Sequence, residues 1–347
     1  MNGPDRQVRL GIALAPESPV RELVAVAADA ESLGCDTVWV NDDRLQKDVF
    51  TVSAAISAST RRIRFGPGVT NPWSRHPALL ATAIATLDEF SGGRAVLGLG
   101  AGGTNHRMLG IERRAPARGL HEAITLVKGL LADEEVTLDG QVIKAHGAHL
   151  EFTPTRANVP IYVGARGPRV LEVAGELADG VIVGSVASAA GWRYAIARIT
   201  AGCQRARRSL DELALSAWLP FAVADDRALA IDAVRRMVTT SLITSRPILD
   251  SLEVELPERF TRTMEALDWS LNTSAVAQGA RTVPEDLIRR FAVAGTPSDC
   301  REQLERLLTE VPEITELSII PFPVAGQSRL DVVQQFLGDA IRAAVHV

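Results

Sequence analysis

Short apolar segments alternate with amphipathic segments of helical spacing along most of the chain, and this alternation constrains the fold more than any other feature. Residues 8–13 are apolar, residues 20–33 repeat apolar side chains three and four positions apart, and Gly34 stands where a helix would end. Residues 37–40 are again continuously apolar, as expected for a parallel strand that is buried on both faces. Continued along the chain, this order predicts strands at 8–13, 37–40, 63–69, 95–99, 161–163, 180–183, 213–223 and 317–320.

Helical patterns separate and follow these strands, at residues 20–33, 49–59, 78–90, 119–131, 170–177, 192–208, 299–309 and 330–345. Strict alternation implies right-handed crossovers and a parallel sheet, and eight repeats favour closure into a barrel over an open sheet. We therefore predict a (β/α)8 TIM barrel of the α/β class, with residues 1–347 forming one domain.

Two segments interrupt the alternation. Residues 132–158 contain the turn pair Asp139-Gly140 between apolar stretches at 136–138 and 149–152, which predicts a β-hairpin inserted after the fourth helix. Residues 225–290 are mostly helical and are divided by prolines, which predicts a helical insertion after the seventh strand.

Composition limits the class of function. With 46% hydrophobic and 23% charged residues and a net charge of −5, the chain has material for a large core and no strong basic excess. Its short arginine runs lack interleaved aromatic residues, so we expect no nucleic-acid binding. No apolar stretch reaches the ~18 residues of a membrane span, and no export signal is recognisable. Three widely spaced cysteines give no disulfide framework, and a reducing cytoplasm is the expected location.

In a barrel of this kind the functional site is built from the loops that follow the strands. The polar and glycine-rich residues in these positions are Asp42 and Asp43; Thr70 and Asn71; Gly100, Ala101, Gly102, Asn105 and His106; Gly164, Ala165, Arg166, Gly167 and Pro168; and Gly184 and Ser185. Glycines let backbone N–H groups approach an anion, and Gly167-Pro168 stands at the start of a helix whose dipole favours phosphate. A phosphate site is one interpretation; glycines that serve only to turn the chain are the other.

Other chemistries lack their motifs. The chain has no Walker-type loop, no dinucleotide fingerprint in a suitable context and no Gly-x-Ser-x-Gly elbow. His76, His106 and His121 lack metal-ligand spacing, so no metal site is predicted. Asp42 and Asp43 at a strand end suit acid/base or hydrogen-bonding roles, and a helix-capping pair is the alternative.

Several stretches of the chain resemble the luciferase-like monooxygenase superfamily. They are residues 65–72 (FGPGVTNP), 75–77 (RHP), 85–89 (ATLDE), 91–94 (SGGR), 97–102 (LGLGAG), 160–168 (PIYVGARGP) and 292–297 (AVAGTP). Within the superfamily the chain is similar to the branch that uses the deazaflavin coenzyme F420, typified by methylenetetrahydromethanopterin reductase.

The resemblance implies a (β/α)8 barrel, usually a homodimer, with a flavin or deazaflavin ring over the barrel mouth. It implies a non-proline cis peptide at Gly68-Val69 that backs the ring, and contacts of Thr70, Asn71 and Asp42 with the coenzyme. It also places the coenzyme phosphate at the loops of residues 164–168 and 184–185. Gly68, Val69, Gly100, Ala101 and Gly102 are further candidates for coenzyme contact.

The sequence also departs from the family. Asp43 stands where several relatives carry histidine, and Ala101-Gly102 where some dehydrogenases carry glutamate. The acid/base groups of those relatives therefore do not transfer, and the small-molecule substrate stays open. On placement alone His76, Asn105, His106 and Trp218 are the candidates for substrate contact.

The resulting hypothesis is an F420-dependent oxidoreductase that transfers a hydride between the deazaflavin and a small organic substrate. A separate flavin or F420 reductase would be the source of reduced coenzyme. The alternatives are an FMN-dependent two-component monooxygenase of the same superfamily and a non-catalytic flavin-binding protein. Coenzyme preference and turnover distinguish the three.

Overall fold

The computed structural model describes residues 8–43, 45–102 and 105–338, which fall into two compact units. We call Gly11–Ile182 with Arg198–Leu215 the N-terminal unit. Residues 8–10, 183–197 and 216–338 are the described part of the C-terminal unit. Strands β1, β8 and β9 each run from one unit into the other.

In the N-terminal unit, parallel strands form two groups. Strand β1 (Arg9–Leu14) pairs with β2 (Thr37–Val40), which pairs with β3 (Arg64–Pro67). Strand β4 (Leu97–Gly100) pairs with β7 (Ile161–Gly164), which pairs with β8 (Gly180–Gly184). Single bridges at Phe65 with Ala95 and at Thr70 with Leu99 join β3 to β4. The strands are buried almost throughout, which explains their continuous apolar character.

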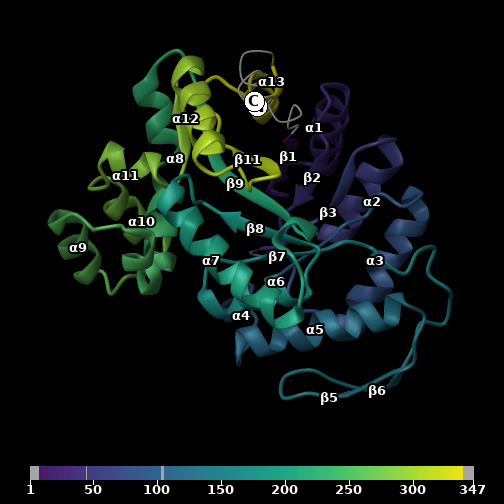
Figure 1. Cartoon of the computed structure of the whole chain (residues 1–347). Coiled ribbons are helices and arrows are strands. Elements are labelled where there is room, and N and C mark those ends of the chain that lie inside the picture. The colour runs from purple at the N-terminus through teal and green to yellow at the C-terminus, as the bar shows by residue number, and fades with distance from the viewer. Residues whose placement is uncertain (1–7, 44, 103–104, 339–347) are drawn as a thin grey trace, which may run out of the picture. The chain divides into compact units, whose positions relative to one another are not determined.

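Helices connect these strands in the predicted places: α1 (Val20–Ser32), α2 (Val49–Ser59), α3 (Pro77–Ser91), α5 (Pro116–Leu131), α6 (Pro168–Leu177) and α7 (Ala189–Ala206) (Figure 1). Helix α3 shows how local sequence sets the limits. It begins with a proline in its first turn, where no N–H is needed, and ends at Gly92 in the left-handed conformation with φ 68°.

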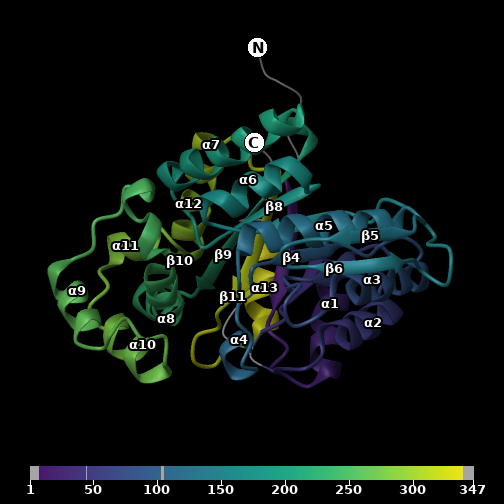
Figure 2. The same ribbon diagram turned by 90° about the horizontal axis from the view of Figure 1, so that it is seen from below.

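The inserted hairpin is formed by β5 (Val136–Asp139) and β6 (Lys144–Ala148), which are antiparallel and lie along α5 (Figure 2). The predicted second strand at 149–152 is wrong. The buried carboxylate of Glu122 on α5 accepts hydrogen bonds from the backbone N–H groups of Gln141, Val142 and Ile143, each at 2.9 Å. This carboxylate fixes the turn at residues 140–143, so the returning strand starts at Lys144.

In the C-terminal unit, β9 (Ala214–Val223) pairs in parallel with β11 (Glu316–Pro321) and with β10 (Val293–Gly295), a short strand that the sequence did not predict. Its helices are α8 (Arg227–Ser245), α9 (Glu258–Glu265), α10 (Thr273–Ala280), α11 (Glu285–Arg289), α12 (Pro297–Glu310) and α13 (Arg329–Leu337). The predicted last helix continues to 345, of which 339–345 lie outside the described residues.

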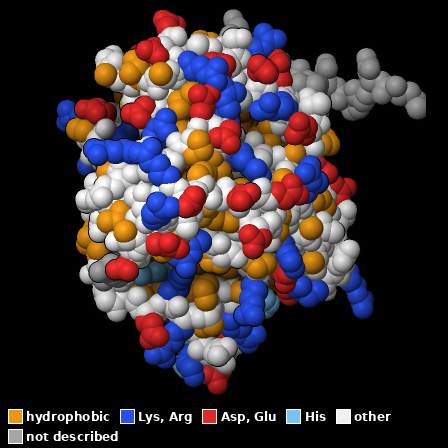
Figure 3. Space-filling model, turned by 90° about the vertical axis from the view of Figure 1, so that its left-hand side faces the viewer, with side chains coloured by type: hydrophobic (Ala, Val, Ile, Leu, Met, Phe, Trp, Pro, Cys, Tyr) orange, Lys and Arg blue, Asp and Glu red, His pale blue; other side chains and the backbone are white. Residues whose placement is uncertain are grey.

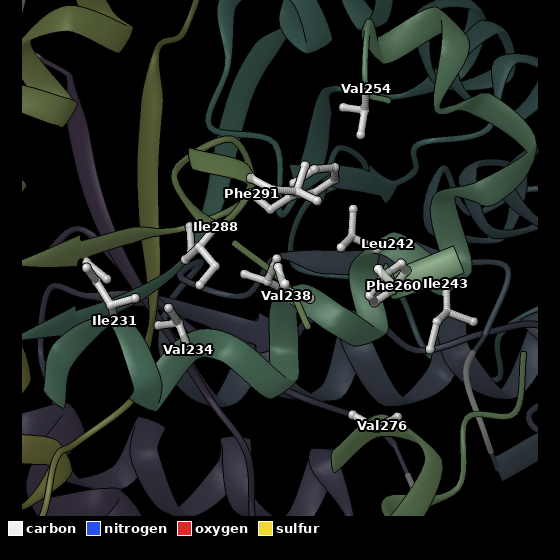
Figure 4. Packing of buried hydrophobic residues seen from close by; sticks show 14 of the residues in the cluster. Ile231, Val234, Val238, Leu242, Ile243, Val254, Phe260, Val276, Ile288 and Phe291 are labelled. Carbon is white, nitrogen blue, oxygen red and sulfur yellow. The ribbon is translucent and has the colours of Figure 1, made fainter. Parts of the chain in front are cut away.

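Helices α8 to α11 occupy the region predicted as a helical insertion and share an apolar core with β9 and β10. Val234, Val238 and Leu242 follow one another along α8 and belong to one cluster with Phe260 and Phe291 (Figure 4). All five side chains are fully buried or nearly so. This spacing of four is the pattern of a helix that buries a single stripe.

The hydrogen-bonded strand order is β3-β2-β1-β11-β9-β8-β7-β4, and the two bridges between β3 and β4 bring its ends together. Eight parallel strands in a nearly closed arrangement, with helices between them, confirm the predicted (β/α)8 barrel. Among the described residues, no helix is long and apolar enough to cross a membrane.

Acidic and basic side chains intermingle on the face shown in Figure 3, without a continuous basic surface there. The three cysteines are buried free thiols, and burial raises the pKa of Cys300 to about 12. This thiol therefore stays protonated and unreactive at neutral pH.

Candidate functional site

The end of β3 departs from regular strand geometry. The peptide bond between Gly68 and Val69 is cis, at the position that the family resemblance implied. Immediately after it, Thr70 donates its backbone N–H to the carbonyl of Gly98 at 2.9 Å and accepts the N–H of Gly100 at 2.8 Å. The chain thus pairs with β4 again at Thr70, directly after the cis peptide bond, and Val69 is partly exposed.

The glycines predicted to form ligand loops fall into two kinds. At Gly100 and Gly164 an added Cβ would meet the side chain of Val69, so these two positions are filled by the protein itself. At Gly167 and Gly184 an added Cβ would meet no described atom within 4 Å. Because the φ of neither residue lies in the left-handed region, turning does not require glycine there, and the open space is available to a ligand.

Asp42, at the end of β2, lies in a network with the two segments that flank it. Its Oδ2 accepts the hydroxyl proton of Thr70 at 2.7 Å and lies 3.5 Å from the guanidinium of Arg75. Arg75 also donates to Asp48 at 2.6 Å and stacks over the ring of Phe50 at 5.3 Å. Both contacts fall on one carboxylate oxygen of Asp42, so its Oδ1 is the oxygen that can accept a hydrogen bond from a ligand.

Asn71 is fully buried and its side-chain amide is fixed in orientation. Its Oδ1 accepts the backbone N–H groups of Trp73 at 3.1 Å and Ser74 at 2.9 Å, which identifies this atom as the oxygen. His106 Nε2 lies 2.8 Å from the same oxygen and must therefore donate its proton to it. Nδ1 of the neutral ring is then the unprotonated nitrogen.

The environment of His106 favours that neutral form. Burial lowers the pKa of the ring, the charge of Arg113 lowers it further, and Asp43 opposes the shift. The ring packs edge-on against Trp73, with centroids 5.9 Å apart, and lies close over Gly102, whose φ is +80°. Gly102 is therefore required both by its conformation and by the ring above it.

Three buried polar atoms near these strand ends have no hydrogen-bond partner in the described part of the chain. Two are donors, Asn71 Nδ2 and Trp73 Nε1, and one is an acceptor, Asn41 Oδ1. Buried polar groups are nearly always hydrogen-bonded in folded proteins, and an unpaired one costs about 1–3 kcal/mol. At each of these atoms a bound ligand or an ordered water would supply the missing hydrogen bond.

The segment from Gly164 to Pro168 follows β7 and leads into α6. Gly167 is the N-cap residue, with φ −72° and ψ 142°, and no side chain caps this helix. Burial lowers the pKa of the Arg166 guanidinium to about 10, while Ala165 donates its N–H to the carbonyl of Ile182. An uncapped helix start beside an arginine has the chemistry of an anion site.

Gly184, Ser185 and Trp218 belong to the C-terminal unit, and the structure brings two of them together. The N–H of Ser185, whose φ is +54°, donates to the carbonyl of Trp218 at 2.7 Å. Trp218 is buried in β9, and its contact with substrate stays a prediction.

The other two candidates for substrate contact are His76 and Asn105. His76 is exposed and caps α3: its Nδ1 accepts the N–H of Ala78 and its Nε2 lies 3.1 Å from the carbonyl of Lys144. Both ring nitrogens thus contact backbone groups, and a substrate role for His76 stays a prediction. Asn105 begins the short helix α4 (Asn105–Met108), but its side chain lies outside the described part of the structure.

Sequence reasoning missed Trp73, Arg75 and Asp48. Trp73 and Arg75 lie in the loop that follows Asn71, and Asp48 is the N-cap of α2. The aspartate before an apolar helical run was a readable capping signal. Nothing in the local pattern connected it to Arg75, 27 residues later.

The luciferase-like monooxygenase family model matches residues 7–311. The 5,10-methylenetetrahydromethanopterin reductase of Methanolobus tindarius is 33% identical over 305 residues, which cover 86% of this chain and 90% of the relative. An F420-dependent glucose-6-phosphate dehydrogenase of Beutenbergia cavernae is 33% identical over 75% of this chain and 80% of its own. The solved coenzyme F420 dependent tetrahydromethanopterin reductase of Methanopyrus kandleri superposes with a TM-score of 0.84 at 26% identity, covering 97% of this chain and 99% of that one. The chain belongs to the luciferase-like monooxygenase family.

Proposed function

We propose that this protein is an F420-dependent oxidoreductase that transfers a hydride between the deazaflavin and a small organic substrate. The relatives named for F420 support this choice over an FMN oxygenase. The observation that carries it is the set of buried, unpartnered hydrogen-bonding atoms where β2 and β3 end, close to a carboxylate with one available oxygen.

The residues fit such a coenzyme in two places. Asp42, Thr70 and Asn71 would hold the ring system, together with Val69 behind it, since they supply fixed donors and acceptors around a partly exposed apolar side chain. Gly167 and Arg166 would hold the phosphate, because the N-terminal amides of α6 and the guanidinium favour an anion beside open space. We propose further contacts with the coenzyme from the remaining strand-end residues Ala101, Ala165, Pro168, Gly184 and Ser185.

When bound, the coenzyme supplies a two-electron hydride donor or acceptor, and the chain supplies orientation and a water-poor environment. Thr70 and Arg75 hold the Asp42 carboxylate in one orientation, which aims its second oxygen. Asn71 acts as a donor through Nδ2, since three donors occupy its oxygen. Asp42 and Asp43 are the proposed catalytic carboxylates. Neutral His106 orients the Asn71 amide by donating a hydrogen bond to its oxygen.

The test is turnover under anaerobic conditions. The purified protein is mixed with reduced F420 and 5,10-methylenetetrahydromethanopterin, or with oxidised F420 and glucose 6-phosphate, and the visible absorbance of oxidised F420 is followed. Formation or loss of this absorbance with either substrate, or with another member of a small-molecule panel, supports the proposal. Turnover only with reduced FMN and oxygen would instead make the protein an oxygenase, and tight coenzyme binding without any turnover would make it a binding protein.

Two helices of the N-terminal unit support a homodimer. Helix α2 carries no charged residue, and α3, which packs against it, exposes Leu79 and Phe90 at 66% and 63%. We propose that a second copy of the chain covers this surface, since exposed apolar side chains of this kind are a common feature of subunit contacts. Sedimentation of wild type and of Leu79→Glu/Phe90→Glu should give a dimer and a monomer; a wild-type monomer contradicts this assignment.

A cytoplasmic location and a separate reductase that supplies reduced coenzyme are parts of the same proposal. The buried free thiols are compatible with a reducing compartment. Coupled assays with an added reductase test the second point, because they measure directly how reduced coenzyme is supplied to the protein.

A further inference from the structure

Val69 is seated between two neighbouring strands that lack side chains where it enters. An added Cβ would lie 2.5 Å from Val69 Cγ2 at Gly100 and 3.0 Å from Cγ1 at Gly164. At Gly98 it would meet the carbonyl oxygen of Pro67 first, at 2.3 Å, and Val69 Cγ1 at 3.1 Å. We call these three glycines the glycine socket. Gly100 and Gly164 are direct cross-strand neighbours in the pairing of β4 with β7, so the socket is one continuous depression.

The socket replaces a layer of ordinary barrel packing. Strand residues of a (β/α)8 barrel fill its interior with their own side chains, in layers. Here the last positions of β4 and β7 are glycines, and the isopropyl group of Val69 fills the space from the end of β3. Val69 as a whole remains partly exposed. The space that the three glycines leave therefore determines where this partly exposed side chain lies.

We propose that Gly98, Gly100 and Gly164 are positioning residues for the coenzyme: by seating Val69 they set the height of the surface on which the ring lies. This inference rests on the proposed function for the identity of the ligand. The packing itself does not depend on that identity.

The test is a double-mutant cycle with wild type, Gly100→Ala, Val69→Ala and the double variant. The methyl of Gly100→Ala would lie 2.5 Å from Val69 Cγ2, well inside ordinary contact, so the Val69 side chain must be displaced. Val69→Ala removes both Cγ atoms and leaves room for that methyl. Coenzyme affinity, measured by F420 fluorescence, should fall at least tenfold in Gly100→Ala and recover to within about threefold of Val69→Ala in the double variant.

A second readout separates positioning from general damage. The absorbance spectrum of bound F420 should shift in Gly100→Ala and return to that of Val69→Ala in the double variant, whereas loss of folded protein would change only its amplitude. Multiplicative losses of affinity in the double variant, or wild-type affinity and spectrum in folded Gly100→Ala, would overturn the proposal.

Failure of the proposed function is recognisable separately, because wild type itself would then not bind F420. In that case the urea midpoints of the four proteins still test the socket. If Gly100→Ala lowers the urea midpoint and the double variant recovers it, Val69 does pack into the glycine socket, but its proposed role toward the coenzyme is rejected. Additive midpoints would reject the socket itself.

Discussion

Replacement of Gly167 tests the anion site at the start of α6, because charge, size and capping can be varied separately there. No described atom lies within 4 Å of an added Cβ, and φ −72° with ψ 142° suits any L-residue at an N-cap. Gly167→Asp, Gly167→Asn and Gly167→Ala should therefore all fold. Asp and Asn should raise the free energy of unfolding by about 0.5–1 kcal/mol, through the new cap and a more restricted unfolded chain.

Gly167→Asp should lower coenzyme affinity although it raises the free energy of unfolding. Two like charges about 5 Å apart, at an effective dielectric constant of about 20, repel by about 3 kcal/mol, which corresponds to roughly 100-fold in affinity. Gly167→Asp should lose affinity by about that factor relative to the isosteric Gly167→Asn. Gly167→Ala should stay within about threefold of wild type, because it adds neither charge nor a cap.

The assay is an F420 fluorescence titration of each variant at low and at moderate salt, with urea unfolding alongside. The difference between Asp and Asn should shrink at about 0.1 M salt, where the screening length is about 10 Å. Equal affinities for Gly167→Asp and Gly167→Asn in folded proteins would refute a phosphate at this helix start.

Three further changes test the surrounding framework. Glu122→Gln should lower the free energy of unfolding by about 2–3 kcal/mol at pH 7, since the buried carboxylate accepts three backbone N–H groups. Although burial opposes its ionisation, these hydrogen bonds lower the pKa of Glu122. Its contribution to the free energy of unfolding is therefore present above the ordinary pKa of 4.5 and is lost as pH falls through the lowered pKa. In urea unfolding the stability difference between Glu122→Gln and wild type should be smaller at pH 3 than at pH 7. Thr70→Val removes the 2.7 Å hydrogen bond to Asp42 and should weaken F420 binding about fivefold in the fluorescence titration, with equal binding as the contrary result. Arg156→Met leaves the buried carboxylate of Asp88 without its two-bond partner and should cost about 3–5 kcal/mol in urea unfolding, whereas a loss under about 1 kcal/mol would show that the pair contributes little.

The fold was predictable because its signal is long-range and repetitive. The limits of α2 and β2 agree with the predicted ones, and the other strands and helices of the alternation agree to within about three residues where they are described. The errors arose where a tertiary contact overrides local pattern. The hairpin turn is placed by Glu122 from another element, and β10 is a three-residue strand that exists by pairing with β9.

The site was predictable as a set of loops but not as a network. The family motif gave the cis peptide and the residues Thr70 and Asn71. It could not distinguish Gly100, which is closed by Val69, from Gly167, which is open, because both read as glycine in a strand-end loop. The partners of Asp42 and Asn71 lie up to 35 residues away, and only the folded chain brings them together.

Parallel titrations of the wild-type protein with F420 and with FMN, each followed by ligand fluorescence, test the central claim most directly. The account predicts saturable, stoichiometric binding of F420 with at least about 100-fold weaker binding of FMN, which is a difference of about 3 kcal/mol. Preference for FMN, or binding of neither coenzyme, would contradict it.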